Sequence, residues 1–284
     1  MNGLLILSTL ENTPMQQYFV MTIDVDPPLY SVPGFIVKAG VVSLLHFLDK
    51  YAIKATFFIP ALVAEKFPTT IREIAEQGHE IACHGLKHDQ WEAILSVDKQ
   101  VRMIETATET IQSITGLRPV GFRAPLFRIN RNCWIALQKN GYVYDSSVVC
   151  SPFYNSHNLF FPIKPFYLPV SKSNKSCNLT EIPVSANPLL PFPLGATPMR
   201  IFGLRWSKVG VKLNFLFRTP VVFHIHPKDV VPRTYGRGWS SYRNTQSCMK
   251  MLDEIIKYVK QSGVKFLKAF ELARLFESGF LETR

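Results

Sequence analysis

The sequence predicts an α/β fold built from short parallel strands that alternate with amphipathic helices. Apolar, β-rich runs occur at residues 17–24, 54–59 and 79–83. Segments between and after these runs have apolar residues at helical spacing. Alternation on this length scale is typical of parallel β/α units. The composition agrees, because 47% hydrophobic and 19% charged residues are ordinary for a folded domain. We therefore expect an α/β barrel or an open parallel sheet.

The elements of the first half follow in regular order. Residues 17–24 read as a strand that ends in acidic side chains, with Pro27 and Pro28 just beyond it. Apolar residues recur at helical spacing over 41–51, which predicts a helix before the strand at 54–59. The other elements predicted in this half are helix 71–78, strand 79–83, helix 97–115, strand 121–123, helix 131–141 and strand 142–145.

The second half contains an interruption. Residues 151–213 are rich in Pro, Ser and Asn, and we expect loops and minor strands there. The alternation then returns with strand 219–225, helix 245–261, strand 264–267 and a last helix from Ala269. The sequence therefore predicts a single domain over 1–284, with a loop-rich insertion at about 151–215.

Net charge, the length of apolar runs and the cysteine pattern indicate which partners and which location to expect. The chain carries 32 Lys+Arg against 21 Asp+Glu, a net charge of +11, which suits nucleic acid, anionic lipid or a phosphorylated substrate. No nucleic-acid module is present, so we expect no nucleic-acid partner. Apolar runs fall far short of the roughly 20 residues that span a bilayer. The start of the sequence lacks the pattern of a secretory signal, and the 5 cysteines form no CxxC pair. These features predict a cytoplasmic protein.

Polar side chains follow the predicted strands where each one ends. The residues concerned are Asp24, Asp26, His84, His88, Arg123, Asp145, His224 and His226. The carboxyl ends of parallel strands open on one face of the fold, so residues that are distant in sequence can converge there. This recurrence predicts a functional site more strongly than any one residue does.

Two of these histidines suggest a metal site. His84 and His88 are four residues apart, and on a helical turn both imidazoles lie on one face and can bind one ion. Asp26 can supply a third ligand, which leaves a coordination position open for water, as in catalytic metal sites. We expect a divalent metal, Zn²⁺ first, with Co²⁺, Mn²⁺, Ni²⁺ or Fe²⁺ as alternatives.

Five short motifs in order resemble those of the polysaccharide deacetylases, also called the NodB-homology or carbohydrate esterase family 4 group. They are Met-Thr-Ile-Asp-Val-Asp at 21–26, His-Gly-Leu-Lys-His at 84–88, Gly-Phe-Arg-Ala-Pro at 121–125, Tyr-Asp-Ser-Ser at 144–147 and Val-Phe-His-Ile-His-Pro at 222–227. The order and approximate spacing agree over residues 18–270, with the motifs falling within 18–150 and 219–270. Each motif is weak alone, and five in register are specific.

The resemblance implies a distorted, incomplete (β/α) barrel and a metal-dependent hydrolase. Its substrate would be an acylated amino sugar of a polysaccharide or glycan, from which it removes an N-acetyl or similar group. The implied metal ligands are Asp26, His84 and His88. Asp24 would be the catalytic base, paired with Arg123, and His226 the general acid, with Asp145 nearby to orient or tune it. His224 lies two residues away on the same strand and could take the acid role instead.

One departure leaves the substrate open. Val25 stands where the family more often has a second aspartate, so this chain resembles the Asp-x-Asp branch. That branch includes enzymes that act on cyclic amides or ureides and on lipid-linked amino sugars. The order Asp-Val-Asp, Val-Pro-Gly, Ala-Thr-Phe-Phe and His-x-x-x-His also resembles formamido-arabinose lipid deformylases. A basic protein suits the surface of an anionic membrane, so peripheral membrane contact fits that alternative.

A non-catalytic sugar-binding module is the least favoured alternative, because such a module needs neither a base such as Asp24 nor an acid such as His226. Aromatic side chains that could stack on sugar rings are Trp91, Phe127, Tyr235 and Trp239. We expect Arg200, in the segment at 191–202, either to contact an anionic group or to be an ordinary surface arginine.

Overall fold

The computed structural model describes residues 16–27, 34–89, 91–149, 151, 162–168, 179–231 and 245–281. Nine strands of this part of the chain form one sheet in the order β6-β7-β5-β4-β3-β2-β1-β8, and β9 also pairs with β1. All pairs are parallel except β6 with β7. The strands are β1 (Tyr18–Asp24), β2 (Thr56–Ile59), β3 (Glu80–Cys83), β4 (Gly121–Phe122), β5 (Tyr144–Asp145), β6 (Phe166–Tyr167), β7 (Thr180–Glu181), β8 (Val221–Ile225) and β9 (Lys265–Leu267).

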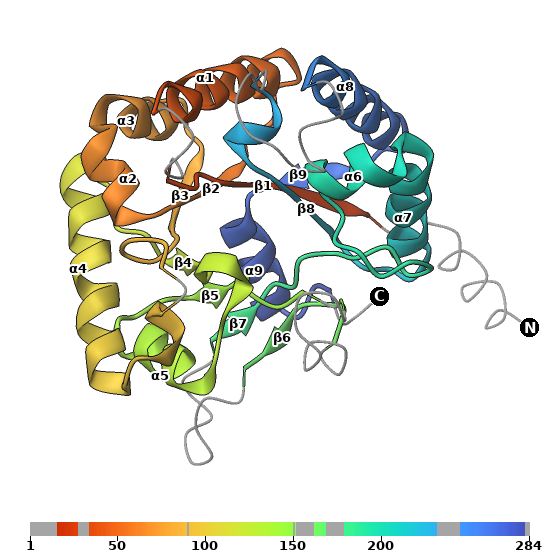
Figure 1. Cartoon of the computed structure of the whole chain (residues 1–284). Helices are drawn as coiled ribbons and strands as arrows, with labels where there is room; N and C mark the ends of the chain where they lie inside the picture. The colour runs from red at the N-terminus through yellow and green to blue at the C-terminus, as the bar shows by residue number, and fades with distance from the viewer. Residues whose placement is uncertain are drawn as a thin grey trace, which may run out of the picture.

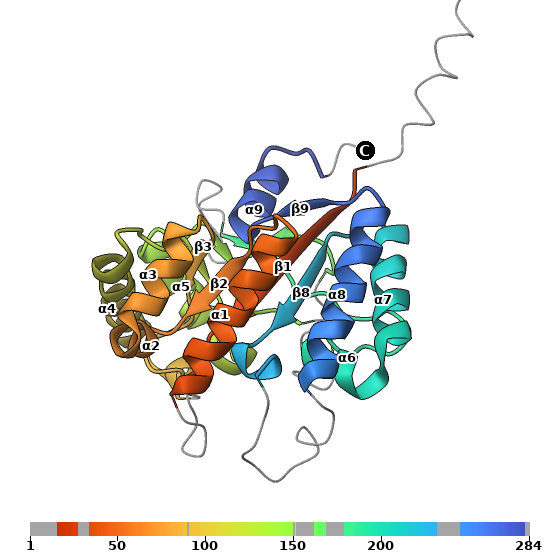
Figure 2. The same ribbon diagram turned by 90° about the horizontal axis from the view of Figure 1, so that it is seen from above.

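The sheet curls, and helices surround its outer side (Figure 1). The helices are α1 (Phe35–Lys50), α2 (Ala61–Lys66), α3 (Pro68–Glu76), α4 (Val97–Thr115), α5 (Arg131–Lys139), α6 (Ala196–Phe202), α7 (Leu204–Leu216), α8 (Thr245–Gln261) and α9 (Ala269–Glu277). Helix α9 differs from the rest, since it lies within the curl near the amino ends of the strands (Figure 2). The order of strands runs from β6 to β8 without closing, so the fold is an incomplete barrel.

Side chains of β1 alternate between two cores. Phe19, Met21 and Ile23 belong to the larger cluster, which includes buried residues of the outer helices. Tyr18 and Val20 belong to the smaller cluster, which lies inside the curl together with residues of α9. Because successive side chains of a strand point to opposite faces, the next inward positions of β1 are Thr22 and Asp24. The hydrophobic pattern therefore orients the polar end of β1 toward the interior.

Local signals in the sequence explain where individual helices begin and end. Helix α4 ends at Gly116, whose φ of 74° is the left-handed conformation in which glycine is favoured. Helix α5 begins after Asn130, whose side chain accepts a hydrogen bond of 3.0 Å from Cys133 N. In the described residues, no helix is both long enough and apolar enough to cross a membrane.

The predicted fold class is confirmed, and α4 and α8 have the predicted bounds. The prediction of loops and minor strands over 151–213 was wrong in part, because α6 and α7 lie there beside the short strands β6 and β7. Val209, Val211 and Leu213 alternate with Gly210 and Lys212, which imitates a strand. Helix α2 was also not predicted.

Candidate active site

The carboxyl ends of β1, β3, β4 and β8 bring the predicted polar side chains together. Asp24 ends β1, His84 follows β3, Arg123 follows β4 and His224 lies in β8. All four side chains are buried, with at most 8% of each residue exposed. The adjoining loops add three more side chains to this cluster: Asp26, His88 and His226. The convergence expected from the parallel sheet is therefore present.

Asp26 faces two imidazoles with one of its carboxylate oxygens. Oδ1 lies 3.1 Å from His88 Nε2 and 3.8 Å from His84 Nε2. This oxygen is buried and accepts no hydrogen bond from the described residues. His84 Nδ1 lies 2.7 Å from the carbonyl of Arg123, so Nδ1 carries the hydrogen and Nε2 is left to face Asp26. Two imidazole nitrogens and one orphaned carboxylate oxygen fit a divalent metal.

The second oxygen of Asp26 has different neighbours. Lys228 Nζ donates a hydrogen bond to Oδ2, and His226 Nε2 lies 3.5 Å from it. Burial by itself would raise the pKa of the Asp26 carboxyl, but His226, the two histidines at Oδ1 and Lys228 outweigh burial and lower it well below its ordinary value. Asp26 is therefore ionised, as a metal ligand must be.

The loop that carries the two histidines is not a helical turn, so that prediction was wrong. Residues 84–89 have no helical structure. Gly85 has a φ of 78° and His88 a φ of 63°, both in the left-handed region, which a right-handed turn cannot contain. The two imidazole rings nevertheless lie 4.9 Å apart between centroids. The loop therefore brings the two imidazoles together, as a helical turn was expected to do.

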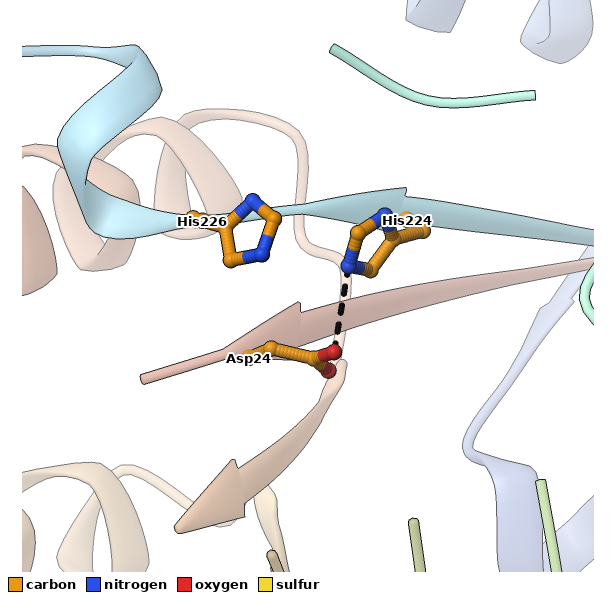
Figure 3. Close-up of side chains that lie close together, drawn as sticks. All are labelled: Asp24, His224 and His226. Carbon is orange, nitrogen blue, oxygen red and sulfur yellow. Dashed lines mark hydrogen bonds and ion pairs between the residues drawn. The ribbon is translucent and has the colours of Figure 1, made fainter. Parts of the chain in front are cut away.

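Asp24 has a partner at each of its oxygens. Arg123 donates to Oδ1 at 2.7 Å, and His224 Nε2 lies 3.1 Å from Oδ2 (Figure 3). Burial would raise the pKa of this carboxyl, but Arg123, His224 and His84 outweigh it and hold the pKa well below its ordinary range. Asp24 is therefore a buried anion that keeps its charge at neutral pH.

Arg123 is held rigidly beside Asp24. Its Nε and one terminal nitrogen donate to the carbonyl and the hydroxyl of Ser146, each at 2.8 Å. The other terminal nitrogen donates to Thr22 Oγ1 at 3.0 Å as well as to Asp24. The guanidinium lies 4.0 Å from the ring centroid of Phe58. Ser146 and Thr22 are thus parts of the site that sequence reasoning missed, although Ser146 lies within the fourth motif.

His226 is oriented by Asp229. Oδ2 of Asp229 accepts from the backbone N of His226 at 3.0 Å and lies 3.3 Å from its Nδ1. The other oxygen of Asp229 accepts from Thr197 Oγ1 at 3.1 Å and from Arg200 at 3.3 Å. With Nδ1 turned to this carboxylate, Nε2 of His226 faces the cluster. An aspartate three residues after a histidine, at the start of a turn, is a capping pattern that could have identified it.

Arg200 proves to be a buried residue, 5% exposed, that pairs with Asp229 rather than a surface arginine.

Asp145 lies elsewhere, so the expectation that it orients His226 is corrected. Tyr144 packs in the inner cluster, and the next side chain along β5 therefore points outward. Asp145 accepts from Trp134 Nε1 at 3.2 Å and from Ser147 Oγ at 2.5 Å. Burial raises the pKa of Asp145 to about 6, against the opposing influence of the hydrogen bonds from Ser147 and Trp134. In the described residues, the carboxylate beside Nδ1 of His226 is that of Asp229.

His224 and His226 differ in their surroundings. Phe127 packs edge-on against His224, with 5.3 Å between ring centroids, and the His224 side chain is 9% exposed. Burial lowers the pKa of His224, against the opposing influence of Asp24. The His226 side chain is 17% exposed and so more accessible to a substrate. The choice of His226 over His224 as the acid stays a prediction.

Of the predicted aromatic contacts, Trp91 is 59% exposed and Phe127 is buried against His224. Tyr235 and Trp239 lie outside the described residues.

Comparison with known proteins gives a consistent assignment. The family model for polysaccharide deacetylase matches residues 11–144. A peptidoglycan deacetylase-like protein of Gibberella zeae is 39% identical over 121 residues, which cover 42% of this chain and 36% of that protein. Other curated relatives named as peptidoglycan or chitin deacetylases are matched over 19% to 44% of their own length. The chain thus spans less than half of the length of these relatives.

Solved structures match nearly the whole chain. A protein of Mycobacterium smegmatis assigned to the polysaccharide deacetylases has a TM-score of 0.62 and 23% identity, with 89% of this chain and 93% of that chain covered. The allantoinase PuuE has a TM-score of 0.67 and 16% identity, with 94% and 92% covered. At these identities the structures establish the fold alone. The chain is therefore similar in sequence to the polysaccharide deacetylases over residues 11–144, and it shares its fold with these solved structures.

Proposed function

We propose that this protein is a metal-dependent hydrolase that removes an acyl group, N-acetyl or similar, from an amino sugar of a polysaccharide or glycan. The observation that carries the proposal is the buried Oδ1 of Asp26, which accepts no hydrogen bond from the described residues and faces the Nε2 atoms of His84 and His88 beside the ionised Asp24. A structural metal site would need no anionic base at its edge. A metal-dependent hydrolytic site needs both the metal ion and a base that accepts a proton from water.

Asp26, His84 and His88 would hold the ion, and Zn²⁺ suits their nitrogen and carboxylate donors. A divalent ion bound there would polarise the amide carbonyl and lower the pKa of an attacking water. Three protein ligands would leave such an ion able to bind water or substrate as well. Lys228 and His226 lie beside the other oxygen of Asp26, Oδ2.

Asp24 is suited to act as the base. Its negative charge is stabilised by the guanidinium of Arg123, 2.7 Å from Oδ1. It accepts the proton of the attacking water as the new bond from oxygen to the acyl carbon forms. His224 and Arg123 fix the carboxylate in one orientation, so the chain itself supplies the alignment.

His226 is suited to act as the acid. Breaking the bond between the acyl carbon and nitrogen leaves an amine that needs a proton, and Nε2 of His226 faces the cluster from which that proton would be given. The carboxylate of Asp229, 3.3 Å from Nδ1, fixes the orientation of the ring. The products are then a free carboxylic acid and the amino sugar, with the proton taken by Asp24 balancing the one given by His226.

The relatives support an N-acetylated amino sugar as the substrate. Their names are peptidoglycan deacetylase, chitin deacetylase and peptidoglycan-N-acetylglucosamine deacetylase. Deacetylation of this class is therefore the activity to test first. A lipid-linked formylated or acetylated amino sugar at a membrane surface, and a cyclic amide or ureide, are the competing substrates that the same chemistry would admit.

The test is an acid-release assay with protein reconstituted with Zn²⁺. The arms are chitin oligosaccharides, peptidoglycan fragments, N-formyl amino sugars free and lipid-linked, and allantoin. We expect release of acetate from the N-acetylated glycans, abolished by a chelator and restored by metal. Hydrolysis of allantoin alone, or of the lipid-linked substrate alone, would replace the proposed substrate class. No hydrolysis in any arm by the metal-loaded protein would overturn the proposal.

A further inference from the structure

The loop between the two histidines is organised by a buried glutamate, Glu92. Its carboxylate accepts hydrogen bonds from three backbone N–H groups of this loop. Oε2 accepts from Leu86 N at 3.0 Å, while Oε1 accepts from Lys87 N at 2.8 Å and from Asp89 N at 3.1 Å. Glu92 itself is only 8% exposed. The side chain thus takes the place of the intrahelical bonds that this non-helical segment lacks.

The fit between Glu92 and the loop is close. A Cβ at Gly85 would lie 2.2 Å from Oε2 of Glu92 and 2.9 Å from Cγ of Pro125, so any other residue would displace the carboxylate. Gly85 also has a φ of 78°, where glycine is favoured. The glycine in His-Gly-Leu-Lys-His is therefore explained by the approach of Glu92 as well as by the turn.

Glu92 is anchored on its own side. The carbonyl of the next residue, Ala93, accepts from Gln100 Nε2 at 3.2 Å and from Asn130 Nδ2. Gln100 is fully buried in α4 and also donates to the carbonyl of Leu95 at 2.9 Å. The carboxylate is thus held against the long helix α4 and the start of α5.

The two histidines depend on Glu92 to different degrees. His84 directly follows β3: its backbone N donates to Ile59 O at 2.9 Å and its ring contacts the Arg123 carbonyl at 2.7 Å. His88 has the left-handed φ of 63°, and it lies between Lys87 and Asp89, whose N–H groups both donate to Oε1 of Glu92. A residue in this conformation persists only where its surroundings fix it.

We propose that Glu92 is a positioning residue for the metal site: it fixes His88 at the distance from His84 and Asp26 that lets the three share one ion. This inference rests on the proposed metal site of the preceding section. The carboxylate contacts no ligand atom in the described structure and acts through the backbone on either side of His88. Partners one step removed from the ligands commonly change metal affinity about 10–100-fold when they are replaced.

The test compares Zn²⁺ affinity, by competition with a chromophoric chelator, in wild type, Glu92→Gln and the control Glu105→Gln. Glu105 is an exposed glutamate of α4. We expect Glu92→Gln to bind Zn²⁺ about 10–100-fold more weakly than wild type, and Glu105→Gln to bind like wild type. The melting temperatures of the metal-free proteins verify that the variants are folded.

Hydrogen exchange of the metal-free proteins separates positioning from general destabilisation. If Glu92 acts through the loop, Glu92→Gln weakens Zn²⁺ binding and speeds exchange of the Leu86, Lys87 and Asp89 amides, while the amides of β1 and β8 stay protected. Weaker Zn²⁺ binding with faster exchange throughout the described strands, or with unchanged exchange of these three amides, would overturn the inference. Should Glu92→Gln fail to fold, hydrogen exchange on the wild-type protein decides: slow exchange of the Leu86, Lys87 and Asp89 amides supports it, and unprotected amides overturn it.

The two proposals fail in different ways. Wild-type protein that binds Zn²⁺ and hydrolyses an acylated glycan, with Glu92→Gln binding equally well, would remove the role of Glu92 and leave the proposed function intact. Wild-type protein that binds no metal would remove both.

Discussion

Two clusters with the same residue types, one aspartate and two histidines, lie side by side at the carboxyl ends of the strands. One cluster is Asp26, His84 and His88, and the other is Asp24, His224 and His226. Within each cluster, one potential metal-binding atom of each residue lies within 4.8 Å of those of the other two. The carboxylates differ in their partners. Both oxygens of Asp24 are engaged, by Arg123 and His224, whereas Oδ1 of Asp26 accepts nothing in the described structure.

This difference separates metal binding from proton transfer. An ion at the Asp24 cluster would have to sit next to the Arg123 guanidinium, 2.7 Å from Asp24, and that charge opposes a second cation. At the Asp26 cluster the cation is Lys228, which contacts Oδ2 and leaves Oδ1 facing the two imidazoles. The two clusters contain the same residue types. Their neighbouring cations and hydrogen bonds therefore distinguish the cluster suited to a metal from the one suited to proton transfer.

The largest effect is expected from His84→Ala. This change removes one of three metal ligands from a buried position, so we expect the metal and all hydrolysis to be lost. Metal content per protein, measured after dialysis, tests the assignment directly. A stoichiometric ion retained in His84→Ala would mean that the metal lies elsewhere, and would return the Asp24 cluster to consideration.

Asp24→Asn should separate the two clusters. The variant loses its anion but keeps its shape, so we expect bound metal at the wild-type level and turnover lower by about 10²–10⁴, the usual contribution of a general base. The measurement pairs metal content with the rate of acetate release. Loss of metal in Asp24→Asn would instead make Asp24 a ligand and contradict the division of roles.

Asp229→Asn should have a smaller effect on the same reaction. It replaces the carboxylate that contacts His226 Nδ1 by a neutral group, and hydrogen bonds to charged groups are worth about 1.5–3 kcal/mol, which corresponds to a fall in kcat of about 10–150-fold. Metal affinity should stay within a few fold. Asp145→Asn is the matched control. Asp145 faces away from the site, so this substitution should leave kcat nearly unchanged. Similar kcat values for the two variants would contradict the assignment of Asp229.

The sequence was sufficient to predict much of this arrangement. Strand and helix periodicity predicted the parallel sheet, and the rule that parallel strands share a carboxyl edge predicted the meeting of Asp24, His84, Arg123 and His224. It failed where side-chain direction or a local loop decides the outcome. Asp145 ends a strand as the others do, but its position along β5 turns it outward.

A related reason explains why the sequence did not predict the roles of Glu92, Ser146 and Asp229. Each acts through contacts with backbone groups or with another side chain of the site, and no motif spacing marks such a role. The helical turn expected at 84–88 was wrong because the spacing of two histidines does not reveal the glutamate that shapes the loop between them.

The smallest expected effect concerns two fully buried carboxyl groups on the outer face of the sheet, Asp145 and Glu181, each of which changes the pKa of the other. Burial raises the pKa of Asp145 to about 6, and burial together with Asp145 raises the pKa of Glu181 well above its ordinary value. The folded protein therefore binds more protons here than the unfolded chain, so this pair stabilises the fold at low pH, and its contribution falls as pH rises from about 4 through 6.

Glu181→Gln should remove the like charge and place an amide N–H toward Asp145, since Oε2 of Glu181 accepts no hydrogen bond in the described structure. We expect the variant to gain about 1 kcal/mol in free energy of unfolding at pH 7.5 and less at pH 4.5, by urea denaturation. A gain that is absent at pH 7.5, or equal at both pH values, would show that the pair does not share a proton. None of the hydrogen bonds and ion pairs recorded for Asp24 and Asp26 involves this pair, so metal affinity should stay at the wild-type value.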